Sequence, residues 1–238
     1  MIEPGTAVAP VGVVCVAAGD GTRLRGGTPK ALIEVAGVAL VVHAVRSLAA
    51  AGLPPPVVVH PAGAGPAVAQ ALADEQIAAL VPGGATRTDS VRRGVSALPA
   101  GCDPIAIHDA ARPFVPVEVI RRVLAAVQDD VRAAAPGLPV ADTLKRVADG
   151  AVLTTIDREG LVGVQTPQVF PRDVLDAVLA TDGEATDELT LVERWIETGR
   201  LTGRVVVVPG SVFAHKVTYP DDLEVVAALA RMTRQVAP

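Results

Sequence analysis

The fold of this chain is set by residues 13–32, which read VVCVAAGDGTRLRGGTPKAL. An apolar run that suits a buried strand stops at Ala17, and small residues then continue as far as Pro29. A glycine-rich loop after a strand of an open α/β sheet lets a phosphate approach the backbone N–H groups closely. Arg23 and Lys30 would add positive charge where a triphosphate would lie. We therefore expect a nucleotide-binding site at this loop.

Two familiar phosphate-binding motifs do not describe the loop. The P-loop ends in Gly-Lys-Ser/Thr, whereas Lys30 lies between Pro29 and Ala31. The dinucleotide-binding fingerprint needs a third glycine, and Leu24 occupies that position. An ordinary glycine turn is the remaining alternative, and two cations in a loop of small residues argue against it.

The composition limits the class of protein. Half of the 238 residues are hydrophobic but only 2% are aromatic, so a core would consist mainly of Val, Ala and Leu. The net charge of −5 gives no general attraction to nucleic acid or anionic membrane, and no apolar run reaches the roughly 18 residues that span a bilayer. Cys15 and Cys102 fit free thiols in a reducing compartment. We expect a cytoplasmic protein that binds neither nucleic acid nor membrane.

Strand-like and helix-like segments alternate along the chain. We predict strands over residues 11–16, 57–60, 77–81, 104–108 and 204–208. We predict helices over residues 38–51, 66–73, 86–98, 116–132, 171–180 and 187–198, with a last one from Asp221. This order predicts an α/β fold: a Rossmann-like, mostly parallel sheet with helices on both faces, formed by residues 11–232 as a single domain.

The pattern changes over residues 138–165. Short β-rich runs are separated there by Asp149-Gly150 and Glu159-Gly160, and such pairs favour tight hairpins. We predict a protruding β-hairpin arm that packs either on its own domain or, as a dimerisation arm, on a second subunit. Residues 1–10 precede the first strand, and we expect a disordered tail there.

A second glycine turn, at residues 83–91, enters a predicted helix that Thr86 or Thr88 would cap. Its N–H groups and Ser90 would read the polar edge of a base. The alternative is an ordinary capped helix start. Elsewhere, Glu184, Asp187 and Glu188 are typical of a helix N-terminus, where the dipole favours carboxylates.

The string HDAARP, at residues 108–113, places a carboxylate and a cation where a predicted strand ends. Open α/β sheets bind their ligands at this carboxyl edge. Asp109 would hold Mg²⁺ on triphosphate oxygens, or would bind a ribose hydroxyl. The structural alternative is an Asp109–Arg112 pair that only holds the loop.

These stretches together resemble a known family. AAGDGTRL at residues 17–24, followed by Pro29-Lys30, is similar to the signature of nucleotidyltransferases that join a nucleoside triphosphate to a sugar or polyol phosphate. With HDAARP and the later strings, the chain resembles the 2-C-methyl-D-erythritol 4-phosphate cytidylyltransferase family from about residue 13 to residue 229. The later strings are DTLKR at 142–146, DREGL at 157–161, QTPQ at 165–168, TDE at 186–188 and KVT at 216–218.

The resemblance implies a role for each matched residue. The nucleotide would lie against residues of the two glycine loops, which are Ala17, Ala18, Gly19, Gly84, Arg87 and Ser90. The catalytic cations around the phosphates would be Arg23, Lys30 and Lys216. The methylerythritol phosphate would contact Asp109, Arg112, Thr143, Arg158, Thr166 and Thr186. Thr143 and Arg158 would reach the substrate bound to the other subunit of a homodimer.

The resemblance also implies CTP and methylerythritol phosphate as substrates. It implies Mg²⁺ as the cofactor, held mainly by phosphates and with Asp109 as a ligand. In such a transfer an acceptor phosphate oxygen attacks the α-phosphorus of CTP, and catalysis consists of positioning and charge neutralisation. Two alternatives stay open. One is a cytidylyltransferase for another polyol phosphate, such as ribitol 5-phosphate; the other is a nucleotide-binding regulator without turnover.

Overall fold

The computed structural model describes residues 9–19, 21–24, 27–181 and 183–236. Most of the tail predicted to be disordered, residues 1–8, lies outside this part. At the end of the predicted tail, the carbonyl of Pro10 accepts a hydrogen bond from the N–H of Asp103 at 2.9 Å. The chain therefore joins the body immediately before its first strand.

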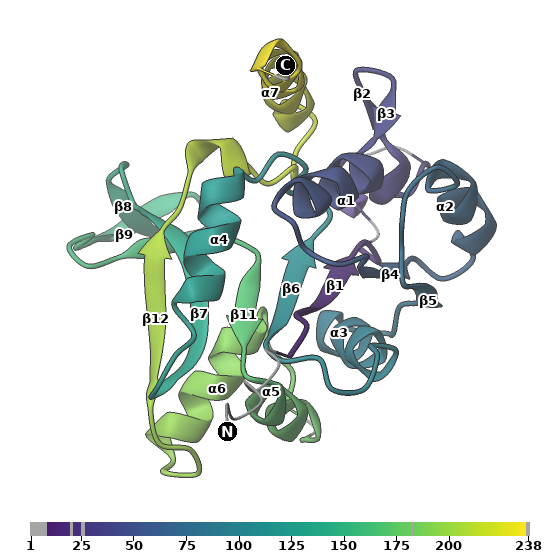
Figure 1. Cartoon of the computed structure of the whole chain (residues 1–238). Coiled ribbons are helices and arrows are strands. Elements are labelled where there is room, and N and C mark those ends of the chain that lie inside the picture. Colours follow the sequence, from purple (N-terminus) through teal and green to yellow (C-terminus); the bar gives the residue numbers. More distant parts are fainter. Residues whose placement is uncertain (1–8, 20, 25–26, 182, 237–238) are drawn as a thin grey trace, which may run out of the picture.

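A mixed sheet of eight strands forms the centre of the molecule, in the order β10-β7-β11-β6-β1-β4-β5, with β12 paired to β7 (Figure 1). Strands β1, β4, β5 and β6 run parallel, as do β7 and β12, whereas β10 and β11 are antiparallel to their neighbours. The strands span Gly12–Val16 (β1), Val57–His60 (β4), Ala79–Pro82 (β5), Ile105–Asp109 (β6), Val131–Pro139 (β7), Val162–Val164 (β10), Gln168–Phe170 (β11) and Arg204–Pro209 (β12). The predicted mostly parallel α/β sheet is confirmed.

Helices cover both faces of this sheet. Strand β1 lies between β4 and β6, and its side chains alternate: Val14 packs with helices α3, α5 and α6, whereas Val13 and Cys15 pack with α1, α2 and α4. A strand that is buried on both faces reads as a continuous apolar run, which explains the sequence pattern. The helices span Leu40–Ala50 (α1), Gly65–Ala71 (α2), Arg87–Ser96 (α3), Val117–Ala125 (α4), Arg172–Leu179 (α5), Glu188–Glu197 (α6) and Asp222–Val236 (α7).

Helix α3 packs on the sheet through a glycine. Its N-cap Thr86 accepts a hydrogen bond from the N–H of Asp89, which confirms one of the two predicted caps. Further along, a Cβ atom at Gly94 would collide with the side chains of Val14 and Val59. The absence of a side chain at Gly94 therefore lets the helix lie close to β1 and β4.

The prediction was wrong at strand β7. The helix predicted over 116–132 ends at Ala125, and residues 131–139 form a long strand that pairs with β10, β11 and β12. The sequence there, VRAAAPGLP, is rich in alanine, which favours helix in isolation. Burial of Ala133, Ala134 and Ala135 between neighbouring strands overrides that preference.

The predicted arm is present in part. Strands β8 (Leu144–Ala148) and β9 (Ala151–Ile156) form a hairpin that projects from the body (Figure 1). Asp149 and Gly150 both have positive φ, 48° and 78°, as the favoured two-residue hairpin turn requires. The second predicted hairpin was wrong: the segment at Glu159-Gly160 leads into β10, and β10 pairs with β7.

The rest of the chain forms short elements and the last helix. Strands β2 (Glu34–Val35) and β3 (Val38–Ala39) make a small hairpin, so the predicted helix over 38–51 begins only at Leu40. Single turns of 3₁₀ helix lie at Thr22–Leu24, Lys30–Leu32 and Val212–Ala214. Helix α7 packs Val226 and Ala230 against Val35, Leu40 and Val217. Among the described residues, no helix has the length and apolar character that crossing a membrane needs.

Candidate active site

A cavity of about 550 Å³ lies at the carboxyl ends of strands β1 and β6, beside the N-terminus of α3. The structure brings many of the predicted site residues together in its wall. These are Ala17, Ala18, Gly19, Lys30, Gly84, Arg87, Ser90, Asp109 and Lys216. They come from five separate parts of the chain, and the sheet edge expected to bind a ligand is the place where they meet.

The glycine turn on one side of the cavity is held by Ser90. The Ser90 hydroxyl accepts a hydrogen bond from the N–H of Gly84 at 3.1 Å and donates to the carbonyl of Thr86 at 3.0 Å. Its side chain therefore shapes the turn that enters α3. A direct contact between Ser90 and a base stays a prediction.

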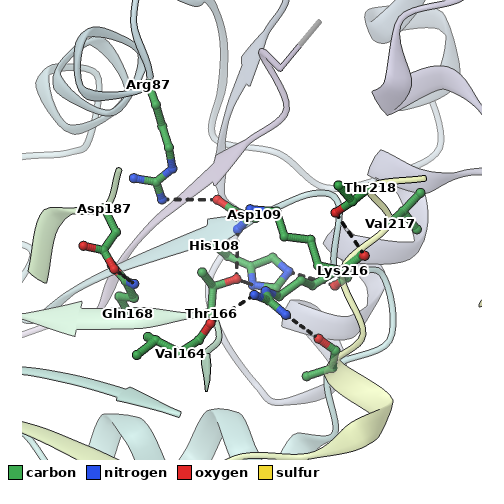
Figure 2. Close-up of polar contacts among 12 residues, drawn as sticks. Arg87, His108, Asp109, Val164, Thr166, Gln168, Asp187, Lys216, Val217 and Thr218 are labelled. Carbon is green, nitrogen blue, oxygen red and sulfur yellow. Dashed lines mark hydrogen bonds and ion pairs between the residues drawn. The ribbon is translucent and has the colours of Figure 1, made fainter. Parts of the chain in front are cut away.

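Asp109 lies between two cations on the other side of the cavity. Its Oδ2 atom is 2.6 Å from Nζ of Lys216, and its Oδ1 atom is 3.2 Å from Nη2 of Arg87 (Figure 2). Arg87 also places Nη1 at 2.7 and 2.6 Å from the two carboxylate oxygens of Glu188. The expected structural alternative, an Asp109–Arg112 side-chain pair, is replaced by these contacts to Arg87 and Lys216.

Neighbouring charges shift the pKa values of Asp109 and Arg87. Burial by itself would raise the pKa of Asp109, but Arg87 and Lys216 outweigh it and hold that pKa well below its usual range. Burial by itself would lower the pKa of Arg87, and the carboxylates of Asp109 and Glu188 raise it instead. These contacts favour the carboxylate form of Asp109 and the cationic form of Arg87.

The segment that carries Lys216 is fixed from two sides. Nζ of Lys30 donates to the carbonyl of Val217 at 3.2 Å, which ties the residue after Lys216 to the end of the first loop. Asp222 accepts hydrogen bonds from the N–H groups of Thr218 and Tyr219, both at 2.7 Å, at the start of α7. The lysine on this segment is thus presented by backbone that is tied both to the first loop and to the last helix.

A chain of hydrogen bonds through Thr166 and His108 holds the backbone of Asp109. The N–H of Asp109 donates to Oγ1 of Thr166 at 3.1 Å, and Thr166 in turn lies 3.1 Å from Nδ1 of His108 (Figure 2). Nε2 of His108 lies 3.1 Å from the carbonyl of Arg112, which can only accept, so Nε2 carries the proton and Thr166 donates to Nδ1. Burial lowers the pKa of His108 to about 4, which keeps the ring neutral.

Thr166 is buried and Arg112 is half-buried, and both are bonded to the protein. The Arg112 guanidinium donates to the carbonyl of Ala214 at 2.8 Å and to that of Val164 at 3.2 Å. It thereby ties the segment before Lys216 to strand β10. Neither Arg112 nor Thr166 lines the cavity, although the sequence predicted that both contact the acceptor.

Four further predicted site residues lie outside the cavity. Arg23 is exposed, with its guanidinium carbon 5.7 Å from the centre of the Tyr219 ring. Thr143 and Arg158 are exposed beside the arm, and Arg158 lines a second hollow formed by residues 139–141 and 157–162. Thr186 is exposed just before α6. Within one chain, the structure does not bring these four to Asp109 and Lys216.

One residue of the site was assigned only a local role by the sequence. Asp187 and Glu188 do begin helix α6, as predicted, and Asp187 caps it through the N–H of Thr190. Glu188, however, is fully buried and paired with Arg87. The sequence feature that indicates burial of Glu188 is its position one turn before Leu191 and Val192, on the core-facing stripe of the helix. A glutamate at such a position needs a buried cation.

Comparison with known proteins decides between the candidate families. The family model for 2-C-methyl-D-erythritol 4-phosphate cytidylyltransferase (IspD) matches residues 11–232. The chain belongs to this family. The predicted family is thus confirmed, and with it the reaction class: an IspD nucleotidyltransferase that converts CTP and 2-C-methyl-D-erythritol 4-phosphate to 4-diphosphocytidyl-2-C-methyl-D-erythritol, in the non-mevalonate route to isoprenoids.

Relatives and solved structures agree with this membership. The chain is 42% identical to the 2-C-methyl-D-erythritol 4-phosphate cytidylyltransferase of Streptomyces avermitilis, over 96% of this chain and 95% of that protein. It is 46% identical to the bifunctional enzyme IspD/IspF of Clavibacter michiganensis, of which it spans about half (52%). The crystal structure of the cytidylyltransferase from Thermus thermophilus superimposes with a TM-score of 0.76 at 34% identity, covering 93% of this chain and 99% of that one. The IspD fold therefore extends over nearly the whole of this chain.

Proposed function

We propose that this IspD-family chain transfers the cytidylyl group within the cavity around Asp109, by bringing two phosphates together and neutralising their charge. The observation that carries the proposal is that Lys30 and Lys216 line the same cavity as the glycine-rich loop, with Lys30 bonded to the backbone of Val217, the residue after Lys216. Two anionic substrates repel each other, so a site that joins them needs fixed cations at the point of contact. The ammonium groups of Lys30 and Lys216 would supply these cations beside the loop after β1.

In this proposal CTP lies across the glycine loops. The base and ribose would rest on Ala17, Ala18, Gly19 and Gly84, whose small size lets a ligand approach the backbone closely. Arg87 and Ser90 shape the same wall through their bonds to Asp109, Glu188 and Gly84. The triphosphate then extends toward Lys30 and Lys216.

The chemical step is an in-line displacement. A phosphate oxygen of the acceptor forms a bond to the α-phosphorus of CTP, and the bond from that phosphorus to the bridging oxygen of pyrophosphate breaks. Lys30 and Lys216 stabilise the negative charge that develops on the α-phosphate and the leaving group. Arg23, which lies over Tyr219 outside the cavity, would add its charge near the phosphates.

The donor set fits a divalent cation that is held mainly by substrate phosphates. Asp109 is the acidic residue among the described residues that line the cavity, and the described chain holds no cluster of three or more metal-ligating side chains. Mg²⁺ commonly binds through one or two carboxylates together with phosphate oxygens. Asp109 would hold Mg²⁺ here, and the ion would neutralise phosphate charge when bound.

The acceptor site would be shared between two subunits. Asp109 and Thr186 belong to one chain, while Thr143 and Arg158 lie exposed beside an arm that carries exposed Val147, Val152 and Leu153. We propose that this apolar arm packs on a second subunit and that Thr143 and Arg158 contact the methylerythritol phosphate bound there. Because Arg112 and Thr166 already bond to their own chain, we assign them the positioning of Asp109 and of the Lys216 segment.

The proposal is tested by pyrophosphate release with CTP, Mg²⁺ and either 2-C-methyl-D-erythritol 4-phosphate or ribitol 5-phosphate. Release with the first acceptor and not the second is expected. Release only with ribitol 5-phosphate would contradict the assigned acceptor contacts, and binding of CTP without release in either case would favour a regulator. The buried free thiols of Cys15 and Cys102 support a cytoplasmic location.

A further inference from the structure

Four alternating charges form a row through the site. Glu188 pairs with Arg87, Arg87 with Asp109, and Asp109 with Lys216, at closest distances of 2.6, 3.2 and 2.6 Å. The row begins on helix α6, passes the N-terminus of α3 and the end of β6, and finishes on the segment before α7. Only its last members lie where the phosphates are proposed to bind.

The first pair of the row is the most buried. The side chain of Glu188 is 0% exposed and that of Arg87 is 25% exposed. Breaking such a pair would leave an uncompensated buried charge, so the structure keeps these two groups together. Glu188 also lies too far into the core to line the cavity, and its effect on the reaction has to pass through Arg87.

The hydrogen bonds of Arg87 determine which oxygen of Asp109 is open to Lys216. Arg87 gives Nη1 to both oxygens of Glu188 and only Nη2 to Oδ1 of Asp109. Oδ2 of Asp109 is therefore left to Lys216. An arginine fork without another carboxylate prefers to bind one carboxylate with two parallel hydrogen bonds. Released from Glu188, Arg87 would take both oxygens of Asp109.

We propose that Glu188 is a positioning residue for Lys216. By holding one half of the Arg87 fork, Glu188 keeps Arg87 from occupying both oxygens of Asp109 and so reserves Oδ2 for the lysine. This inference rests on the catalytic role of Lys216 under the proposed function. It gives the buried glutamate a task in the reaction that is separate from joining α6 to α3.

The test compares steady-state pyrophosphate release of Glu188→Gln with that of the unaltered protein, both shown to be folded by thermal unfolding. The glutamine keeps the shape of the side chain but not its charge. A fall in kcat of roughly tenfold or more is expected, because a displaced catalytic group loses its geometry, with a smaller change in KM for CTP. Glu197→Gln is the matched control: it makes the same change at an exposed position of α6, and its kcat should stay unchanged.

A double-mutant cycle separates positioning from a structural role. In the Lys216→Ala background, Glu188→Gln should lower kcat by less than twofold, since the group that it positions is gone. The same tenfold loss in both backgrounds would overturn the inference. If Lys216→Ala alone keeps full kcat, the failure lies in the proposed function, and the two failures are thus distinguishable.

A second variant covers the case in which Glu188→Gln does not fold. Glu188→Asp keeps the charge and shortens the side chain, so it weakens the hold on Arg87 without leaving a lone buried charge. Its kcat should fall about threefold in the otherwise unaltered protein and by less than twofold in the Lys216→Ala background. The same fall in both backgrounds would overturn the inference.

Discussion

Nζ of Lys216 lies 2.6 Å from Oδ2 of Asp109, although 107 residues separate the two in the sequence. Asp109 ends strand β6, and Lys216 follows a turn of 3₁₀ helix after β12. The pair joins the parallel half of the sheet to the half built around β7. It also places an ammonium group at the wall of the cavity in a fixed orientation, which is what a reaction between two phosphates requires.

Lys30→Ala and Lys216→Ala should each lower kcat about 10²-fold, or ~3 kcal/mol in the transition state, by analogy with the loss of one oxyanion donor. The measurement is pyrophosphate release at saturating CTP and acceptor. Arg121→Ala removes an exposed cation from helix α4 and serves as the control, with unchanged kcat. Equal kcat for the lysine variants and the control would contradict the proposed charge neutralisation.

A shared active site predicts complementation between two inactive variants. Arg158→Ala damages the contact given to the partner, whereas Lys216→Ala damages the chain's own site. In a random mixture of the two, half of the dimers are mixed and each has one intact site, so activity should recover to about one quarter. The assay is activity before and after the subunits are exchanged. Sedimentation that shows only monomer, or a mixture that stays inactive, would argue against the shared site.

Lowering the pH should destabilise the protein through His108. Its folded pKa of about 4 lies below the ordinary value of 6.5, so the unfolded chain binds more protons between these values and stability falls as the pH falls through that window. Between pH 7 and pH 5 the expected loss is about 2 kcal/mol. Urea unfolding at both pH values measures it. His108→Gln should lose this part of the dependence, and an equal drop in both proteins would refute the assignment.

Gly94→Ala should destabilise the protein, against the ordinary preference of helices for alanine. A solvent-exposed glycine in a helix would gain about 1 kcal/mol from this change. At Gly94 the added methyl group would collide with Val14 and Val59, and such overpacking costs about 1–3 kcal/mol. Chemical denaturation gives the difference in free energy of unfolding. A more stable variant would show that α3 can move away from β1 without cost.

Tyr219 should assist Arg23 through its ring face. The guanidinium lies 5.7 Å from the ring centre, and an exposed cation–π contact contributes about 0.5–1 kcal/mol. Tyr219→Ala should therefore lower kcat/KM by roughly twofold to fivefold, while Tyr219→Phe, which keeps the ring, should lower it less than twofold. If the phenylalanine variant lost as much as the alanine variant, the hydroxyl would be the relevant group.

The parts of the fold that were predicted correctly are those with strong local signals. The apolar run before Ala17, the strand at 57–60, the cap at Thr86 and the Asp149-Gly150 turn are each decided by residues close together in sequence. Strand β7 was missed because its alanines carry no strand preference of their own. Their strand conformation comes from three neighbouring strands that supply hydrogen bonds and burial.

By itself, the sequence determined the family, the glycine loops and the residue types of the site, because these depend on short motifs in a fixed order. Only the tertiary structure decided which charges pair. Asp109 had Arg112 three residues away, yet it binds Arg87 and Lys216. The core position of Glu188 and the hydrogen bonds of Arg112 to Ala214 and Val164 explain why. A buried charge takes the partner that the packing brings within reach, whatever its distance along the chain.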